Sequence, residues 1–310
     1  MRSASRRSRV PAPGASFARG AFFLAIVGLA LAPLTAEAQQ VELRYQYEEG
    51  AELRYEMVST STTGMPGMGD VRQEQRQVIR MNVLSVDGEG NARIRHTVES
   101  IRLDMVTPMG TQSYDSESGN APTDPAMAPL AAMAGISSEV VIRPDGSLVD
   151  AGDLQSWIEQ MLQGLDAEAR AQVEGLLDAE ALEGMMEQSF QALPPSRMAV
   201  GDTWEQSFSM PMPFGTLSAA LVHTLDAVET REGREVALFT MTGTLGDFEP
   251  EPGNPMAGML GIGGGDLSGR MEFDLTSGML LVSESTTTLR MDAMGQMIET
   301  RNTATMRLLR

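Results

Sequence analysis

Residues Asp150–Leu193 read DAGDLQSWIEQMLQGLDAEARAQVEGLLDAEALEGMMEQSFQAL, and this is the only long run of helical periodicity in an otherwise strand-like sequence. Large apolar residues recur three or four positions apart, which places them on one face of a helix. In the first half this face comprises Leu154, Trp157, Ile158, Met161, Leu162 and Leu165; in the second half it includes Leu182, Met185, Met186 and Phe190. A one-sided helix needs an apolar partner surface, so we expect this segment to pack against the neighbouring strands.

Alternating apolar and polar residues on both sides of this segment predict strands joined by tight turns. The strand-like runs are 41–47, 53–61, 71–86, 92–105, 140–142 and 148–149, then 214–229, 235–248, 266–275, 279–291 and 296–309. We expect the first two runs to form a hairpin, and a change of parity near Ser100 predicts a bulge. The order of strands, helices and strands predicts an α+β, mainly β fold: a large curved antiparallel sheet, or half-open barrel, with the helical block packed on one face.

The glycine-rich run 258–265 contains Gly261, Gly263, Gly264 and Gly265. A phosphate-binding loop would lead into a helix and carry a lysine, whereas this run leads into a strand and the sequence contains no lysine. We expect a flexible loop over the mouth of the sheet.

The N-terminal residues have the layout of a secretory signal peptide: arginines, an apolar run from Ala21 to Leu34, and then Ala36-Glu37-Ala38. The apolar run is shorter than the roughly 20 residues that a membrane-spanning helix needs. We therefore expect residues 1–38 to be a cleaved signal peptide and 39–310 to form a single β-rich domain with a helical insert at about 150–193. The chain has no cysteine, so neither a lipidated cysteine nor a disulfide is available. The expected location is the periplasm or the exterior, with no membrane-spanning segment after cleavage.

The chain carries a formal net charge of −19. Such an acidic surface repels phosphate backbones, so nucleic acid is not an expected partner. The absence of lysine excludes Schiff-base chemistry and a phosphate-loop lysine.

Catalytic motifs are not apparent, and we expect no enzyme activity, no metal and no cofactor. His96 and His223 are the only histidines, and each lies among apolar residues, which favours a partly buried structural histidine over a general base. Methionine is abundant, with 24 residues. Thioethers could hold Cu(I), but adaptable apolar surface in loops and lid is the preferred interpretation.

Small residues occupy the middle of one predicted strand face. The odd positions of 279–291 read Met279, Leu281, Ser283, Ser285, Thr287, Leu289 and Met291. Either a helix backbone comes close to this face or a cavity exists there.

Three features resemble an uncharacterised family of exported bacterial proteins. They are Leu43-Arg44-Tyr45 and Leu53-Arg54-Tyr55 around Gly50, the Pro144-Asp145-Gly146 turn, and Leu193-Pro194-Pro195 followed by Val200-Gly201-Asp202-Thr203-Trp204. More remotely, the layout is similar to the half-barrels of periplasmic lipoprotein and lipid carriers, a resemblance that implies a hydrophobic cavity between sheet and helices.

The sequence thus predicts a noncatalytic exported protein that binds a hydrophobic small molecule or lipid between sheet and helices. The alternative is a cell-envelope module that binds an unknown protein partner through its acidic surface or a sheet edge. The residues expected to contact the ligand are Trp157, Met161, Met186, Phe190 and His96.

Overall fold

The computed structural model describes residues 40–65, 67, 69–120, 122, 127–163, 170, 193–194, 196–212, 215–250, 260–293 and 295–309. The chain divides into two compact units, residues 1–37 and 38–310. The description below concerns the second unit.

This unit is mainly β and contains one twelve-stranded antiparallel sheet in the order β6-β5-β3-β2-β1-β12-β11-β10-β9-β8-β7, with β4 paired to β3. The sheet is not closed, because β6 and β7 stand at its two ends. The strands are β1 Glu52–Met65, β2 Gly69–Val86, β3 Ala92–Thr107, β4 Gly110–Asp115, β5 Ser137–Ile142, β6 Leu148–Asp150, β7 Thr203–Met212, β8 Gly215–Arg231, β9 Arg234–Pro250, β10 Leu260–Asp274, β11 Met279–Ala293 and β12 Gln296–Leu309.

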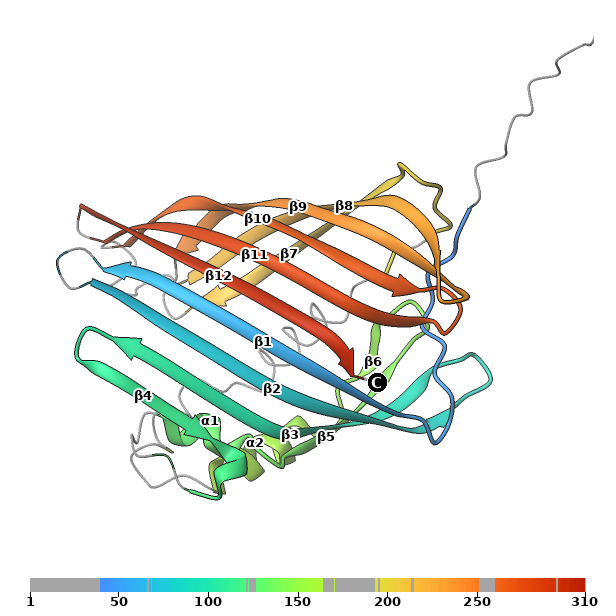
Figure 1. The fold of residues 1–310 in the computed structure, drawn as a ribbon, viewed down its shortest axis with the longest axis horizontal. Coiled ribbons are helices and arrows are strands. Elements are labelled where there is room, and N and C mark those ends of the chain that lie inside the picture. Colours follow the sequence, from blue (N-terminus) through green and yellow to red (C-terminus); the bar gives the residue numbers. More distant parts are fainter. Residues whose placement is uncertain are drawn as a thin grey trace, which may run out of the picture. The chain divides into compact units, whose positions relative to one another are not determined.

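The first and last strands pair with each other at the centre of the sheet. β1 and β12 run antiparallel from Arg54 opposite Leu309 to Thr63 opposite Thr300. Figure 1 shows them side by side, with the β2–β4 side below and the β11–β8 side above. Segments far apart in sequence therefore build the middle of the sheet together.

Two short α-helices occur in the described residues, α1 Ala128–Ala132 and α2 Leu154–Gln163, besides the 3-10 turn η1 Ser116–Ser118. α2 contacts β5 and α1, and its buried residues are Leu154, Ile158, Met161 and Leu162. These residues belong to the predicted apolar face, so the first part of the helical prediction is confirmed. Most of the remainder, including Met186 and Phe190, lies outside the described residues. Within the described part of the chain, neither α-helix has the length and apolar character needed to cross a membrane.

The predicted hairpin between 41–47 and 53–61 is wrong. β1 pairs with β2 and β12, and Val41 makes only an isolated bridge to Met198. We call residues Val41–Glu48 the strap. Its backbone bonds elsewhere: the Tyr45 N–H donates to the Pro144 carbonyl at 2.7 Å, and the Gln46 N–H donates to the Gly278 carbonyl at 3.3 Å. Alternation alone could not distinguish an extended strap from a paired strand.

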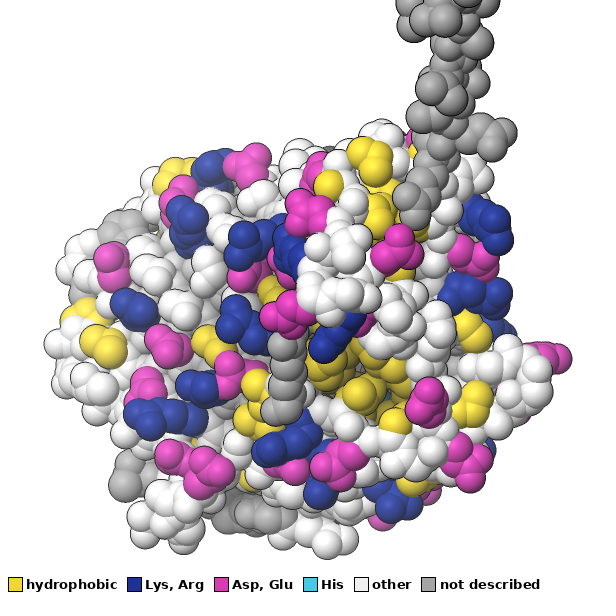
Figure 2. All heavy atoms as spheres, turned by 45° about the vertical axis from the view of Figure 1, so that its right-hand side comes forward, with side chains coloured by type: hydrophobic (Ala, Val, Ile, Leu, Met, Phe, Trp, Pro, Cys, Tyr) yellow, Lys and Arg dark blue, Asp and Glu magenta, His cyan; other side chains and the backbone are white. Residues whose placement is uncertain are grey.

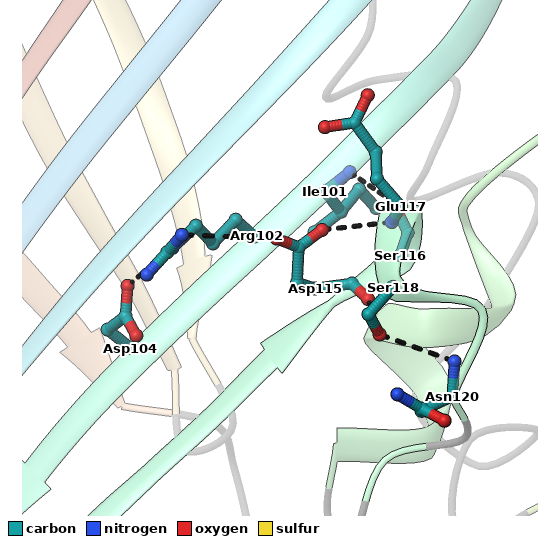
Figure 3. Close-up of polar contacts among 8 residues, drawn as sticks. All are labelled: Ile101, Arg102, Asp104, Asp115, Ser116, Glu117, Ser118 and Asn120. Carbon is teal, nitrogen blue, oxygen red and sulfur yellow. Dashed lines mark hydrogen bonds and ion pairs between the residues drawn. The ribbon is translucent and has the colours of Figure 1, made fainter.

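The predicted bulge near Ser100 is confirmed. Val78 lies opposite Ser100, while its neighbour Ile79 lies opposite Val98. At this point β3 also changes partner from β5 to β4. The Ile101 N–H is left between the two ladders and donates to the Ser116 hydroxyl at 2.9 Å (Figure 3).

The η1 turn that supplies this hydroxyl is itself held by local bonds. The Asp115 carboxylate accepts from the Glu117 N–H at 2.9 Å, and the Ser118 hydroxyl donates to the Asp115 carbonyl at 2.7 Å. Figure 3 shows these bonds together with the Arg102–Asp104 contact. The Ile101 N–H, which β4 and β5 leave unpaired, therefore still has a hydrogen-bond partner.

The glycine run is not a loop where the structure describes it. Leu260, Gly261 and Ile262 pair with β11, and a register shift follows before Gly265. Gly264 has φ +82°, a backbone conformation that glycine adopts readily. A Cβ at Gly265 would meet the Thr288 carbonyl oxygen. The glycines therefore allow a bulge and a close strand approach, which composition alone did not reveal.

Two apolar clusters are connected by the strap. One contains Val41, Leu43, Met198, Leu225, Ala237, Phe239, Met271, Phe273 and Leu280. The other contains Val83, Ala92, Ile94, Val140 and Ile142, with Tyr47 packed against it. We call the sheet face that bears Tyr55, Phe239 and Phe273 the core face, and the opposite one the solvent face.

Candidate functional site

A hollow of about 320 Å³ lies on the core face where β2, β1, β12 and β11 run next to each other. It is lined by Met57, Val58, Ser59, Gln75, Gln77, Ser283, Ser285, Ala304, Thr305 and Met306. The register explains most of this set: Met57 lies opposite both Gln77 and Met306, and Ala304 lies opposite both Ser59 and Ser285. Cross-strand partners share a face, so these side chains converge there. Val58 and Thr305 lie opposite each other with the other parity, and their side chains belong to the solvent face.

Charged residues of these strands alternate onto the solvent face, where they form ion pairs. Glu56 on β1 pairs with Arg76 on β2, and the Arg270 guanidinium on β10 lies 2.8 Å from Glu284 on β11. Such exposed pairs contribute little to stability individually. Because the charged side chains lie on the solvent face, all described residues that line the hollow are uncharged.

Four polar side chains of the hollow lack hydrogen-bond partners within the described residues. They are the half-buried Gln75, Gln77, Ser283 and Ser285. Further along the same face the polar groups do pair: the Ser59 hydroxyl donates to the Asn302 amide oxygen at 3.0 Å, and the Thr63 and Thr300 hydroxyls lie 3.0 Å apart. The hollow therefore combines apolar surface with unused neutral donors and acceptors.

An aromatic group borders the strap end of this face. The Tyr45 ring stacks on Tyr47 with centroids 5.5 Å apart and meets Phe273 edge-on at the same distance. The Tyr55 hydroxyl donates to the Leu280 carbonyl at 3.0 Å. Burial raises the pKa of Tyr45 to about 12, so its phenol remains neutral.

Figure 2 brings the right-hand side of Figure 1 forward and shows hydrophobic side chains at the floor of a recess, with arginine and acidic side chains around the rim. The separation of an apolar floor from a charged rim agrees with the alternation of apolar and charged residues along the strands. It is the arrangement expected of a site that takes up apolar surface.

The predicted contact residues do not line this hollow. His96 lies on β3 opposite Met81 and Ser138, and burial lowers its pKa to about 4. Met161 is buried and Trp157 half-buried on α2, which contacts β5. The structure thus brings these three to the β3–β5 side of the sheet, while Met186 and Phe190 lie outside the described residues.

Sequence reasoning missed Met57, Gln75, Gln77 and Met306 as candidate site residues. The signal that pointed to their location was the small, hydroxylic middle of 279–291, because Ser283 and Ser285 do line the hollow. This signal identified only the residues that β11 contributes to the hollow. The residues from β1, β2 and β12 could not be identified, because the sequence does not show which strands lie next to β11.

His223 forms a second unusual feature of the core face. Its ring stacks on Trp204 with centroids 4.2 Å apart and planes at 9°, and the side chain is only 4% exposed. Neither ring nitrogen has a hydrogen-bond partner in the described structure. Burial lowers the pKa of His223 to about 4, so the imidazole is neutral at pH 7.

Comparison with protein families gives a match over more than half of the chain. The model of a family of unknown function (DUF6263) matches residues 89–280. The chain belongs to this family. The matched range begins in the β2–β3 turn and ends at the start of β11, so the residues lining the hollow lie outside it.

Comparisons with individual proteins are more distant. No curated protein sequence matches the chain. A solved structure described as "Lipid-protein interactions in lipovitellin" is similar at TM-score 0.43 and 9% identity, covering 85% of this chain and 25% of lipovitellin. DynF from the dynemicin biosynthesis pathway of Micromonospora chersina gives TM-score 0.21 at 9% identity, covering 88% and 85%. The chain therefore spans about a quarter of the lipovitellin chain.

Proposed function

We propose that this protein is an exported, noncatalytic binding protein that holds a hydrophobic or lipid-like ligand on the core face of its sheet. The observation that carries the proposal is the hollow between Met57 and Met306, lined without any charged side chain. Methionine side chains adapt their shape, which suits ligands with flexible hydrocarbon chains. A volume of about 320 Å³ is at the lower end of the range for small-molecule pockets.

The arrangement of the surrounding sheet supports this proposal. Met306, which lines the hollow, packs against the buried apolar cluster around Phe239 and Phe273, while ion pairs such as Glu56–Arg76 lie on the solvent face. Export follows from the signal peptide expected at residues 1–38, and the proposed location is the periplasm or the exterior.

Native mass spectrometry of protein purified without detergent tests the proposal, followed by organic extraction of any bound molecule. We expect a stoichiometric apolar adduct. The variant Ala304→Leu, which fills the hollow, should lose the adduct. Thr303→Leu is the matched control, because Thr303 is the neighbouring solvent-face residue and should leave the adduct in place.

A clean apoprotein mass together with no uptake of a fluorescent fatty alcohol would overturn this proposal. A cell-envelope module that binds a protein partner would then be the preferred function. Retention of the adduct in both variants would place the ligand elsewhere on the molecule.

A further inference from the structure

We propose that the hollow selects an uncharged amphiphile, a molecule with a hydrocarbon body and neutral hydroxyl, ester or amide groups, over ionised lipids such as fatty-acid anions. This inference rests on the ligand binding proposed above and specifies its chemical class. It is carried by two observations: the neutral polar groups of the hollow that have no hydrogen-bond partner among the described residues, and the position of the charges.

The polar groups stand on either side of an apolar middle. Gln75 and Gln77 project from β2, and Ser283 and Ser285 project from β11. Met57, Ala304 and Met306 lie between them on β1 and β12. An apolar ligand that covered these four groups would remove them from water without replacing their hydrogen bonds, which is costly. A ligand with its own neutral donors or acceptors avoids that cost.

Amide and hydroxyl groups can each donate and accept a hydrogen bond. They therefore match alcohols, esters and amides equally well. Because β2 and β11 are three strand spacings apart, roughly 14 Å measured along the sheet, one small polar group cannot reach both sides. A molecule with neutral polar groups separated by hydrocarbon fits best.

Among the residues that the structure describes, no charged side chain lines the hollow to pair with an ionised ligand. On the strands that form the hollow, the acidic and basic residues alternate onto the solvent face, as Glu56 with Arg76 and Glu284 with Arg270 show. A desolvated carboxylate or phosphate needs a paired charge, and the hollow's lining offers none. The net charge of −19 further disfavours the approach of anions.

The test compares three probes with the same hydrocarbon chain: lauryl alcohol, laurate and lauryltrimethylammonium. Their dissociation constants for the purified protein are measured by calorimetry at mildly alkaline pH and below the concentration at which the probes form micelles. We expect lauryl alcohol to bind about tenfold more tightly than either ion, the size expected from one neutral hydrogen bond and an unpaired charge.

Side-chain variants connect the selectivity to this hollow. The single hydroxyl of lauryl alcohol can reach only one side of the hollow at a time. At least one of the double variants Gln75→Leu/Gln77→Leu and Ser283→Ala/Ser285→Ala should therefore reduce the preference for the alcohol over laurate. Thr286→Ala is the control, since Thr286 neighbours Ser285 on the solvent face and should leave the preference unchanged. The readout is a ratio of affinities, which a general gain in apolar surface or a small loss of stability does not change.

The outcomes separate the two proposals. If laurate binds as tightly as the alcohol, or more tightly, selection for an uncharged ligand is wrong and ligand binding stands. If none of the three probes binds, the proposed function itself fails. If the preference exists but neither double variant changes it, the polar groups of this hollow do not produce it and the inference is overturned.

Discussion

Met57 on β1 lies directly opposite Met306 on β12. A residue of the first strand in the sequence and one of the last strand therefore meet in the middle of the sheet. On the same face Met57 also lies opposite Gln77, and Met306 lies opposite Ser283. Two flexible thioether side chains therefore separate amide groups from hydroxyl groups. This relationship places an adaptable apolar surface between two polar walls.

A charge introduced beside this pair should reverse the ligand preference. Met57 is 38% exposed, so Met57→Lys can keep its ammonium hydrated in the free protein. We expect the variant to bind laurate more tightly than lauryl alcohol, because the ammonium supplies the missing counter-charge. Calorimetry with both probes checks this. An unchanged preference for the alcohol would show that ligands do not reach Met57.

Acid should destabilise the protein in a window set by its two buried histidines. In the folded state the pKa values of His96 and His223 are lowered to about 4, whereas an unfolded histidine titrates near 6.5. The unfolded chain therefore binds protons first, and the free energy of unfolding should fall as the pH drops from about 6.5 to about 4. Each histidine can account for roughly 3 kcal/mol.

The variant His223→Phe tests this assignment, because it keeps a ring against Trp204 and removes the titrating group. Urea unfolding at several pH values should show a shallower fall in this window, with the remainder due to His96. Below about pH 4, carboxylates with lowered pKa values, such as Glu284, should contribute in both proteins. Identical slopes for the two proteins between pH 6.5 and 4 would contradict the assignment.

The contact between the strap and the β10–β11 turn should be sensitive to a single methyl group. Gly278 has φ +65°, and a Cβ there would lie 2.6 Å from the Gln46 nitrogen and 2.7 Å from the Arg44 carbonyl oxygen. Gly278→Ala should therefore lower the free energy of unfolding by more than about 2 kcal/mol. Gly233→Ala is the matched control, with φ +81° and no atom within 4 Å of the added Cβ, and should cost about 1 kcal/mol. If chemical denaturation shows the same loss of unfolding free energy for both variants, the strap can move away from the added methyl group without destabilising the protein.

The core around the strap should tolerate truncation poorly. Phe273 is fully buried and touches Tyr45 edge-on, so Phe273→Ala should cost about 3–5 kcal/mol through lost burial and a residual cavity. Val222→Ala, at a position 36% exposed on the neighbouring part of the sheet, should change stability by less than about 1 kcal/mol. Thermal and urea unfolding would measure both. A small effect at Phe273 would contradict the packing described for this cluster.

Processing at the N-terminus remains a prediction with a direct measurement. N-terminal sequencing of protein from the periplasm or medium of an expressing bacterium should begin at Gln39, after the Ala36-Glu37-Ala38 pattern. The variant Ala36→Leu/Ala38→Leu should accumulate uncleaved, because the peptidase site requires small residues. Wild-type chain that retains Met1 would contradict the assignment of a signal peptide.

Local pattern predicted most of the strands and one of the irregularities. The parity change that predicts a bulge near Ser100 arises from the same residues that create it, and the helical spacing of Leu154, Ile158, Met161 and Leu162 matches the buried side of α2. Pattern failed at the strap and at Gly261–Gly265. The strap, predicted as a strand, makes only an isolated bridge, and the glycine-rich run, predicted as a loop, pairs with β11.

The candidate site was only partly accessible to such reasoning. Ser283 and Ser285 were visible as small residues on a predicted inner face, while Trp157, Met161 and His96 lie outside the hollow's lining. Helical amphipathicity shows that a face is buried, and does not show whether a ligand or the protein itself buries it. Charges on alternate positions, in contrast, correctly indicate which face meets water.

The sequence by itself determined the antiparallel, mainly β character of this chain, the bulge in β3 and the polar middle of β11, because each follows from side-chain spacing within one segment. Only the tertiary structure decided that β1 pairs with β12, that the strap crosses to Gly278, and that Met57 and Met306 share a hollow with Gln75 and Ser285. These are contacts between distant segments. Period-two alternation specifies which face of a strand is apolar and carries no information about which strand lies beside it.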